Sequence, residues 1–404
     1  MILVADKIGS VTSPLNLTKT VSVTHEHNAP RPGDVVVVKA LSESVTYGNL
    51  ELPSGRLAKI NRNDVLLGVL GKRRALKGFV GDVPETIKAG DKLHLLNMGG
   101  VIGICKGHHS SLSDAIEVEV LGIAVRDEGG NPRVSKGANM SEMGFQSEDT
   151  NGSVVSEFLV GEDSAPLLTR GFPRFILNIA DNALRPIDFL NESAPIVVVA
   201  GTCMNSGKTV AATEIIKQAH HAGLKVCGAK MSGVAALRDT LNMEDHGAFR
   251  TASFLDCGLP STVDHENLPS VAKAILNHLN EFQPDLIVVE LGDGIIGGYA
   301  VDSVLKDFEI RQAISSFVFC ASDYVGVVGG MTVLKNLGIE IDVIAGSVTD
   351  SQMGEDFVQE QYGINAGNAR RNGRRLFSLI QTGMDRIDRI VKPNLYDKYS
   401  VNPV

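Results

Sequence analysis

The chain of 404 residues contains no tryptophan, and aromatic residues make up only 5% of it. Proteins that hold single-stranded nucleic acid stack the bases on aromatic side chains, so this composition disfavours such a platform. The net charge is -9. An acidic chain is a poor non-specific partner for phosphate backbones. We therefore do not expect nucleic acid as a partner, although a local basic site stays open.

Cysteines are few and scattered, at positions 105, 203, 227, 257 and 320, and no two form a C-x-x-C pair. This argues against a disulfide framework or a cysteine zinc site and suits a reducing compartment. No apolar run reaches the ~18 residues of a membrane helix. The first residues, MILVADKIGSVTS, lack the basic and apolar regions of a secretory signal. We therefore expect a cytoplasmic protein with no membrane partner.

The chain divides into three regions by composition. Residues 1–125 contain short Val-, Ile- and Leu-rich runs, such as VVVVKAL (35–41), separated by turn residues such as Pro32-Gly33-Asp34. This pattern predicts a small β-rich domain, a barrel or a sandwich, of unknown role. Residues 126–165 are polar, with no apolar period, and are expected to be a linker. Residues 166–404 would form a second domain.

Strand and helix patterns alternate in this second domain from about residue 194. The apolar run Ile196–Ala200 fits a strand buried on both faces, as in a parallel sheet. The pattern predicts an α/β domain with a doubly wound, mostly parallel sheet. The expected strands are 196–200, 225–230, 285–290, 316–321 and 341–346, and the expected helices are 207–221, 247–256, 270–282 and one between the last two strands.

The strongest motif is Gly201-Thr-Cys-Met-Asn-Ser-Gly207-Lys208-Thr209, placed between a predicted strand and a predicted helix. That context is typical of a phosphate-binding loop, or P-loop, whose backbone N–H groups and following helix N-terminus surround phosphate oxygens. Lys208 would supply charge to the β- and γ-phosphates, and the Thr209 hydroxyl would ligate Mg²⁺. Five residues separate the glycines here instead of the usual four. The expected ATP-binding residues are Gly201, Thr202, Asn205, Ser206, Gly207, Lys208, Thr209 and Val210.

The motif resembles the variant loop of the dethiobiotin synthetase family. It is also similar to related amidases and ligases acting on cobyrinate, and to the wider class that includes nitrogenase-iron-protein-like and signal-recognition GTPases. Two more landmarks match that pattern: Val226-Cys-Gly-Ala-Lys230-Met-Ser232-Gly233 at the end of the second strand, and Leu286-Ile-Val-Val-Glu290-Leu-Gly292-Asp293-Gly294. The resemblance covers about residues 195–350 and leaves the first 190 unexplained. It implies a P-loop NTPase fold for the C-terminal domain.

Carboxylates near the predicted loop are candidate metal ligands, because Mg²⁺ prefers oxygen ligands. Glu290 should emerge at the carboxyl end of its strand, beside the loop. The resemblance implies a second carboxylate that approaches Mg²⁺, for which Asp239 and Asp245 are candidates and Asp239 is favoured. It also implies that Lys230 contacts phosphate or a substrate carboxylate. Lys208, Lys230 and Glu290 are thus the expected catalytic residues, and Thr209, Asp239 and Glu290 the expected metal ligands.

Two further features are ambiguous. Asp323 precedes a Gly-rich helix start, which suits a ligand but also ordinary loop packing. The cluster Arg370-Arg371-Asn-Gly-Arg374-Arg375 is the densest basic stretch in the sequence. Arginine clamps phosphates well. A solvated helix face paired with local acids explains the cluster equally well.

These features favour a Mg·ATP-dependent enzyme that activates or phosphorylates a small carboxylate-bearing metabolite, as a ligase or synthetase or as a kinase. A regulatory or metallochaperone-type nucleotide switch is the first alternative, and a homo-oligomer, such as a dimer, is expected because several members of this class dimerise. A polynucleotide 5′-kinase is the second alternative, since a β-domain before a P-loop domain resembles that architecture. Net charge and the scarcity of aromatics oppose it.

Overall fold

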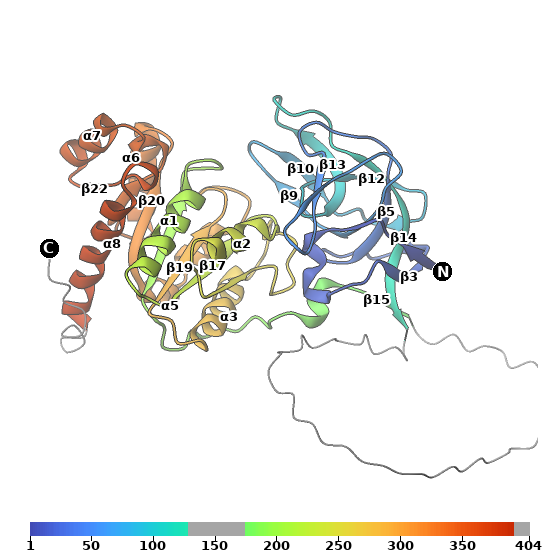
Figure 1. Ribbon diagram of the computed structural model, residues 1–404, viewed down its shortest axis with the longest axis horizontal. Helices are drawn as coiled ribbons and strands as arrows, with labels where there is room; N and C mark the ends of the chain where they lie inside the picture. The colour runs from blue at the N-terminus through green and yellow to red at the C-terminus, as the bar shows by residue number, and fades with distance from the viewer. Residues whose placement is uncertain (128–173, 392–404) are drawn as a thin grey trace, which may run out of the picture.

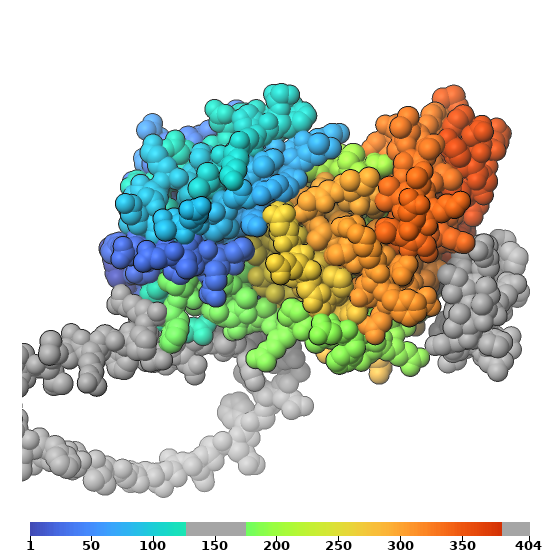
Figure 2. Space-filling model, turned by 180° about the vertical axis from the view of Figure 1, so that it is seen from behind, coloured from blue at the N-terminus to red at the C-terminus, as the bar shows by residue number. Residues whose placement is uncertain are grey.

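The computed structural model describes residues 1–127 and 174–391. Two β-sheet-based domains lie side by side, the N-terminal one drawn in blue and cyan and the C-terminal one in green to red (Figure 1). Seen from behind, the N-terminal domain packs against the yellow part of the C-terminal domain (Figure 2). Lys72 and Asp264 form an ion pair of 3.2 Å across this boundary.

Most strands of the N-terminal domain belong to one 11-stranded sheet. Two short strand pairs, β4 with β11 and β6 with β7, and two 3-10 helices accompany it. The elements are β1 (Ile2–Val4), β2 (Lys7–Ile8), η1 (Ser10–Leu15), β3 (Thr20–Thr24), β4 (Glu26–His27), β5 (Val35–Ala40), β6 (Asn49–Glu51), β7 (Leu57–Lys59), β8 (Val65–Leu70), β9 (Arg73–Arg74), β10 (Phe79–Asp82), β11 (Ile87–Lys88), β12 (Lys92–Leu95), β13 (Val101–His108), β14 (Glu117–Asp127), β15 (Arg174–Ile176) and η2 (Ile179–Asn182).

This sheet closes into a barrel, one of the two β-rich architectures expected from the sequence. The pairings β14–β5, β5–β8, β8–β13, β13–β12 and β12–β14 form a complete circuit. Successive side chains of a strand point to opposite faces. Val36 and Val38 of β5 accordingly join the barrel core, whereas Val35 and Val37 pack in the large core that continues into the C-terminal domain. The continuous Val run is therefore buried on both faces.

The C-terminal domain alternates strands and helices. Its elements are β16 (Ile196–Gly201), α1 (Lys208–His221), β17 (Val226–Ser232), α2 (Arg238–Asp245), β18 (Arg250–Ser253), α3 (Leu268–Asn280), β19 (Leu286–Leu291), α4 (Val301–Lys306), α5 (Phe308–Ala313), β20 (Ile314–Cys320), α6 (Tyr324–Asn336), β21 (Val343–Ala345), η3 (Ser347–Thr349), α7 (Gln352–Tyr362), β22 (Asn365–Ala366) and α8 (Ala369–Val391).

The seven strands of this domain are parallel and lie in the order β18-β17-β19-β16-β20-β21-β22. Val197 and Val199 of β16 pack with α1 and α8, while Val198 and Ala200 pack in the core shared with α3. The sheet is thus covered on both faces, which confirms the expected α/β class. The chain leaves β16 to one side and later returns to its other side, so the carboxyl end of β16 is the switch point where such folds bind ligands.

Two details correct the sequence interpretation. The helix expected over 247–256 is wrong: α2 ends at Asp245, Gly247 has a positive φ of 100°, and Arg250–Ser253 form the edge strand β18 beside β17. Four residues are too few for their apolar pattern to distinguish an edge strand from a helix. Residues 126 and 127 of the predicted linker continue β14, and β15 pairs with β14 in the N-terminal sheet.

Residues 128–165, the rest of the predicted linker, lie outside the described residues, and their role as a linker stays a prediction. In the part of the chain that the structure describes, no helix has the length and apolar character needed to cross a bilayer.

Candidate nucleotide-binding site

The loop between β16 and α1 curls tightly. Asn205 and Gly207 both have positive φ, 64° and 103°. A Cβ on Gly207 would lie 2.9 Å from the Cα of Gly346, so this glycine is required by both conformation and space. At the start of the loop, a Cβ on Gly201 would lie 2.6 Å from the carbonyl oxygen of Cys320. The loop therefore has the strand–loop–helix geometry of a P-loop at the switch point of the sheet.

Lys208, the first residue of α1, is buried beneath this loop. Its Nζ donates a hydrogen bond of 2.7 Å to the carbonyl oxygen of Cys203. Burial lowers the pKa of Lys208, an effect that Glu290 partly opposes. The ammonium thus sits inside the loop, where its charge is poorly solvated and an anion would stabilise it.

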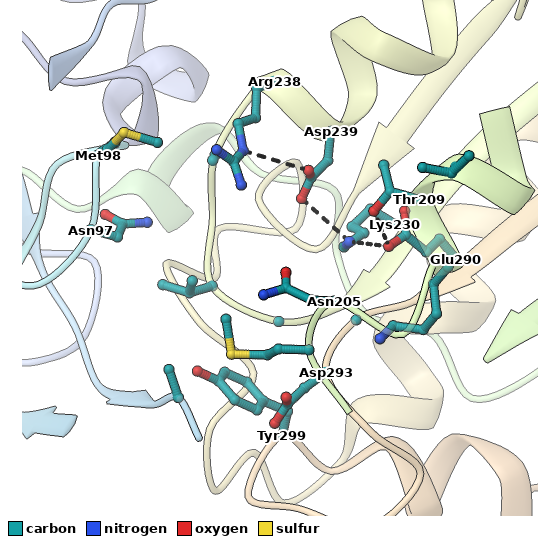
Figure 3. A pocket seen from close by; sticks show the side chains of 18 of the residues that line it. Asn97, Met98, Asn205, Thr209, Lys230, Arg238, Asp239, Glu290, Asp293 and Tyr299 are labelled. Carbon is teal, nitrogen blue, oxygen red and sulfur yellow. Dashed lines mark hydrogen bonds and ion pairs between the residues drawn. The ribbon is translucent and has the colours of Figure 1, made fainter. Parts of the chain in front are cut away.

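Glu290, at the carboxyl end of β19, is the centre of the charged cluster in Figure 3. One of its carboxylate oxygens, Oε1, accepts hydrogen bonds from Thr209 Oγ1 at 2.9 Å and from Lys230 Nζ at 2.7 Å. Lys230 Nζ also lies 3.3 Å from Asp239 Oδ2. Burial alone would lower the pKa of Lys230, but Asp239 and Glu290 outweigh burial and raise it. Lys230 is therefore a charged bridge between two acids.

The second oxygen of Glu290 tests whether these residues fit a metal ion. Glu290 is 1% exposed, yet its Oε2 has no hydrogen-bond partner among the described residues. A buried, unpaired carboxylate oxygen is costly unless something compensates it. Oxygen ligands from Glu290, the Thr209 hydroxyl and Asp239 form a donor set that suits Mg²⁺. These residues fit the metal expected from the sequence.

The cluster opens into a pocket of about 460 Å³ that lies between the two domains. Most of the expected site residues line it: Asn205, Gly207, Lys208, Thr209, Val210, Lys230, Asp239 and Glu290. The opposite wall comes from the N-terminal domain, where Asn97 and Met98 face the cluster across the pocket (Figure 3). The site is thus an interdomain pocket with a P-loop on one side.

Other expected residues lie elsewhere. Gly201 and Ser206 support the loop from within, and Ser206 is fully buried. Thr202 lines a neighbouring pocket and its hydroxyl lies 3.2 Å from that of Ser322. Asp245 is exposed at the end of α2, so of the two candidate carboxylates Asp239 is the one at the pocket. Asp323 accepts the N–H of Gly326 and caps α6.

The arginine cluster splits into two groups. Arg371 Nη1 and Arg375 Nη1 lie 3.1 and 3.4 Å from the two carboxylate oxygens of the buried Glu355 in α7. These two arginines therefore form a structural ion-pair network, which is the second of the two interpretations given above. Arg370 lines the interdomain pocket instead.

Sequence reasoning missed the contribution of the N-terminal domain. Tyr47, Arg73, Asn97 and Met98 line the pocket, but no motif links them to a P-loop more than a hundred residues later in the chain. It also left Asp293 and Tyr299 unassigned, although Asp293 follows Glu290 in a Gly-rich segment that pointed to the site. Burial raises the pKa of Asp293, partly offset by Lys208 and Arg73.

Comparisons with known proteins add little. No family model matches the chain, and no curated protein matches it. Among solved structures, the signal recognition particle receptor FtsY of Elizabethkingia anophelis has 10% identity and a TM-score of 0.34 over 48% of this chain and 66% of that chain, just under two thirds. FtsY of Thermotoga maritima has 13% identity and a TM-score of 0.34, over 50% of this chain and 73% of that chain. The 54 kDa signal recognition particle protein of Aeropyrum pernix, in complex with GDP, has 16% identity and a TM-score of 0.32, over 52% of this chain and 53% of that chain.

These scores are too low to carry an argument about family or function. The P-loop NTPase fold stands on the strand order and the loop geometry described above. The similarities do not support the expected dethiobiotin synthetase-like family, which stays a prediction.

Proposed function

We propose that this protein is a Mg·ATP-dependent enzyme that activates or phosphorylates a small carboxylate-bearing metabolite. The observation that supports it most is the unpartnered Oε2 of Glu290 beside Thr209, Lys208 and the P-loop, in a pocket closed by a second domain. A site that only stored a nucleotide would not need a pocket that continues to another domain. An acceptor between the two walls would use this space.

Each charged side chain has a separate task in this proposal. The loop N–H groups and Lys208 bind the phosphates and stabilise the charge of the transferred phosphoryl group. Bound Mg²⁺ would neutralise charge on the β- and γ-phosphate oxygens, held through Glu290, Thr209 and Asp239. Lys230 orients both carboxylates, and because an ammonium has three N–H donors, one remains for an acceptor oxygen.

A nucleotide switch is the second candidate, and one contact favours it. Glu51 of the N-terminal domain accepts hydrogen bonds from the backbone N–H groups of Leu237 and Arg238, next to Asp239. A movement of Asp239 at the metal site would therefore be transmitted to the N-terminal domain through Glu51. The polynucleotide-kinase alternative loses part of its motivation, because Arg371 and Arg375 are paired with Glu355. The homo-oligomeric state and the cytoplasmic location stay predictions.

Turnover measurements test the proposal. Purified protein is assayed for ATP and GTP hydrolysis with Mg²⁺, alone and with a panel of small mono- and dicarboxylates. We expect ATP turnover that rises with at least one carboxylate, and its loss in Lys208→Ala. Lys217→Ala, on the same helix but paired with Glu214 away from the pocket, is the matched control. Turnover equal in wild type and Lys208→Ala would overturn the proposal, and turnover indifferent to every carboxylate would favour the switch.

A further inference from the structure

Arg73 of β9 is a buried arginine in the wall of the interdomain pocket that the N-terminal domain supplies. It is 3% exposed. One terminal nitrogen donates to the carbonyl oxygen of Leu96 and the other to the hydroxyl of Tyr47, at 3.1 Å for the latter. The guanidinium carbon lies 5.2 Å from the centre of the Tyr47 ring. These contacts fix the orientation of the guanidinium group.

Arg73 has no direct ion-pair partner in the part of the chain that the structure describes. Among the described residues no carboxylate comes within 4.0 Å of its guanidinium, and its Nε is buried with no hydrogen-bond partner. Its neighbour Arg74 differs, since it pairs with Asp82. A buried cation without a counterion is strongly unfavourable, and native proteins pair such groups or neutralise them. An arginine cannot lose its proton, and Asp293, the acid of the pocket that its charge affects, forms no ion pair with it, so an anionic ligand would supply the direct partner.

The position of Arg73 indicates which ligand. In the proposed site, Lys208 and the loop N–H groups on the opposite wall already bind the phosphates of a nucleotide. Arg73 faces the other side of the pocket, and its field reaches the carboxyl of Asp293 and the hydroxyl of Tyr299. An anion here would lie between the P-loop and the barrel, where an acceptor must lie to meet the transferred group.

We propose that Arg73 binds an anionic group of the acceptor, a carboxylate or a phosphate, and that the β-barrel domain is therefore the acceptor-binding domain. This inference rests on the proposed function only in calling the ligand an acceptor, because anion binding at Arg73 can be measured without nucleotide. Planar guanidinium groups bind such oxygens through two parallel hydrogen bonds. The Nε–H of Arg73, which has no partner among the described residues, remains for such an oxygen.

The experiment measures anion binding with succinate, glutarate and inorganic phosphate as probes. Each is titrated into the full chain by calorimetry, with and without Mg²⁺ and a non-hydrolysable ATP analogue. The variants are Arg73→Gln, Arg73→Lys and, as control, Arg31→Gln, an exposed arginine of the same domain outside the pocket. Circular dichroism checks that each variant is folded. If Arg73→Gln is unfolded, the comparison is made with Arg73→Lys, which keeps the charge. A fluorescent ATP analogue measures nucleotide affinity separately.

We expect at least one probe to bind the wild type and Arg31→Gln equally, and about tenfold or more weaker to Arg73→Gln, with nucleotide affinity within twofold. Arg73→Lys should fall between them. Equal affinity of wild type and Arg73→Gln, or no binding by any probe, would overturn the inference. A tenfold loss of nucleotide affinity with unchanged probe affinity would also overturn it, because Arg73 would then serve the nucleotide. Arg73-dependent probe binding in a chain that binds no nucleotide would uphold this site and reject the proposed function.

Discussion

The carboxylate oxygen Oε1 of Glu51 lies 2.7 Å from the backbone nitrogen of Arg238, so an acid of the N-terminal domain caps a helix of the C-terminal domain. Its Oε2 accepts the N–H of Leu237 at 2.8 Å. Glu51 is 1% exposed. The first N–H groups of a helix have no partner within the helix, and a carboxylate there satisfies them and complements the helix dipole. The contact also fixes the first turn of α2, where Asp239 faces Lys230.

Removing this cap should affect both stability and the metal site. In Glu51→Ala two N–H donors in partly buried hydrogen bonds lose their acceptor, which costs about 1–3 kcal/mol of unfolding free energy. Because Asp239 would also be less well fixed, the Mg²⁺ concentration that gives half-maximal ATP turnover should rise. Urea unfolding and a Mg²⁺ titration measure the two effects. Glu43→Ala, an exposed acid of the same domain paired with Lys59, is the control and should change neither. A destabilised Glu51→Ala protein with an unchanged Mg²⁺ midpoint would limit the contact to a structural role.

Much of the C-terminal domain was predictable because its signals are local. The buried run before Gly201 and the spacing of Gly207, Lys208 and Thr209 predicted the loop, and Glu290 ends a strand whose apolar residues are visible in the sequence. The short strand β18 and helix α2 were not predictable, since four to eight residues carry too weak a period.

What the sequence could not show is contact between distant segments. Arg73 and Glu51 become part of the site only through the docking of the two domains, and nothing near them in the sequence refers to Lys208. The arginine cluster shows the converse. Its composition suggested a phosphate clamp, whereas Glu355, from the preceding helix, is the partner that decides the role of Arg371 and Arg375.

Glu290→Gln should weaken metal use more than nucleotide binding. The variant keeps the shape of the side chain but removes the charge of the buried carboxylate and half of the ion pairing of Lys230. We expect the Mg²⁺ midpoint of ATP turnover to rise about tenfold or more. Affinity for a fluorescent ATP analogue in EDTA should stay within twofold, because the loop N–H groups and Lys208 are intact. Glu244→Gln, exposed on α2, is the control. An unaltered midpoint would show that Glu290 is not a metal ligand.

Arg371→Ala combined with Arg375→Ala should destabilise the protein and leave its nucleotide kinetics unchanged. The double change leaves the buried carboxylate of Glu355 without its two cations. Both arginines are partly exposed, so the expected cost is about 1–3 kcal/mol, between the values for exposed and buried pairs. Adding Glu355→Gln to the double variant should restore most of the lost stability. Arg374→Ala, exposed on the same helix, is the control. Thermal unfolding and the KM for ATP distinguish the two interpretations. A tenfold rise in KM with an unchanged melting temperature would support the phosphate-clamp interpretation instead.

Asp293→Asn should raise stability in a pH-dependent way. Burial raises the pKa of Asp293 in the folded protein above its ordinary value of 3.8, despite the opposing charges of Lys208 and Arg73. The folded state then binds the proton more tightly than the unfolded state, so stability is lost as pH rises through the folded pKa. Asparagine removes that loss, and it tolerates the positive φ of 64° at this position. The melting temperature of Asp293→Asn should therefore exceed that of the wild type at pH 7.5, and the difference should shrink as pH falls towards 4.

Asp264→Asn is the matched control, because Asp264 also has a positive φ but is exposed and paired with Lys72. Its replacement should therefore bring no gain in melting temperature at pH 7.5. A difference for Asp293→Asn that is absent, or constant from pH 4 to 7.5, would show that the buried charge of Asp293 carries no energetic cost.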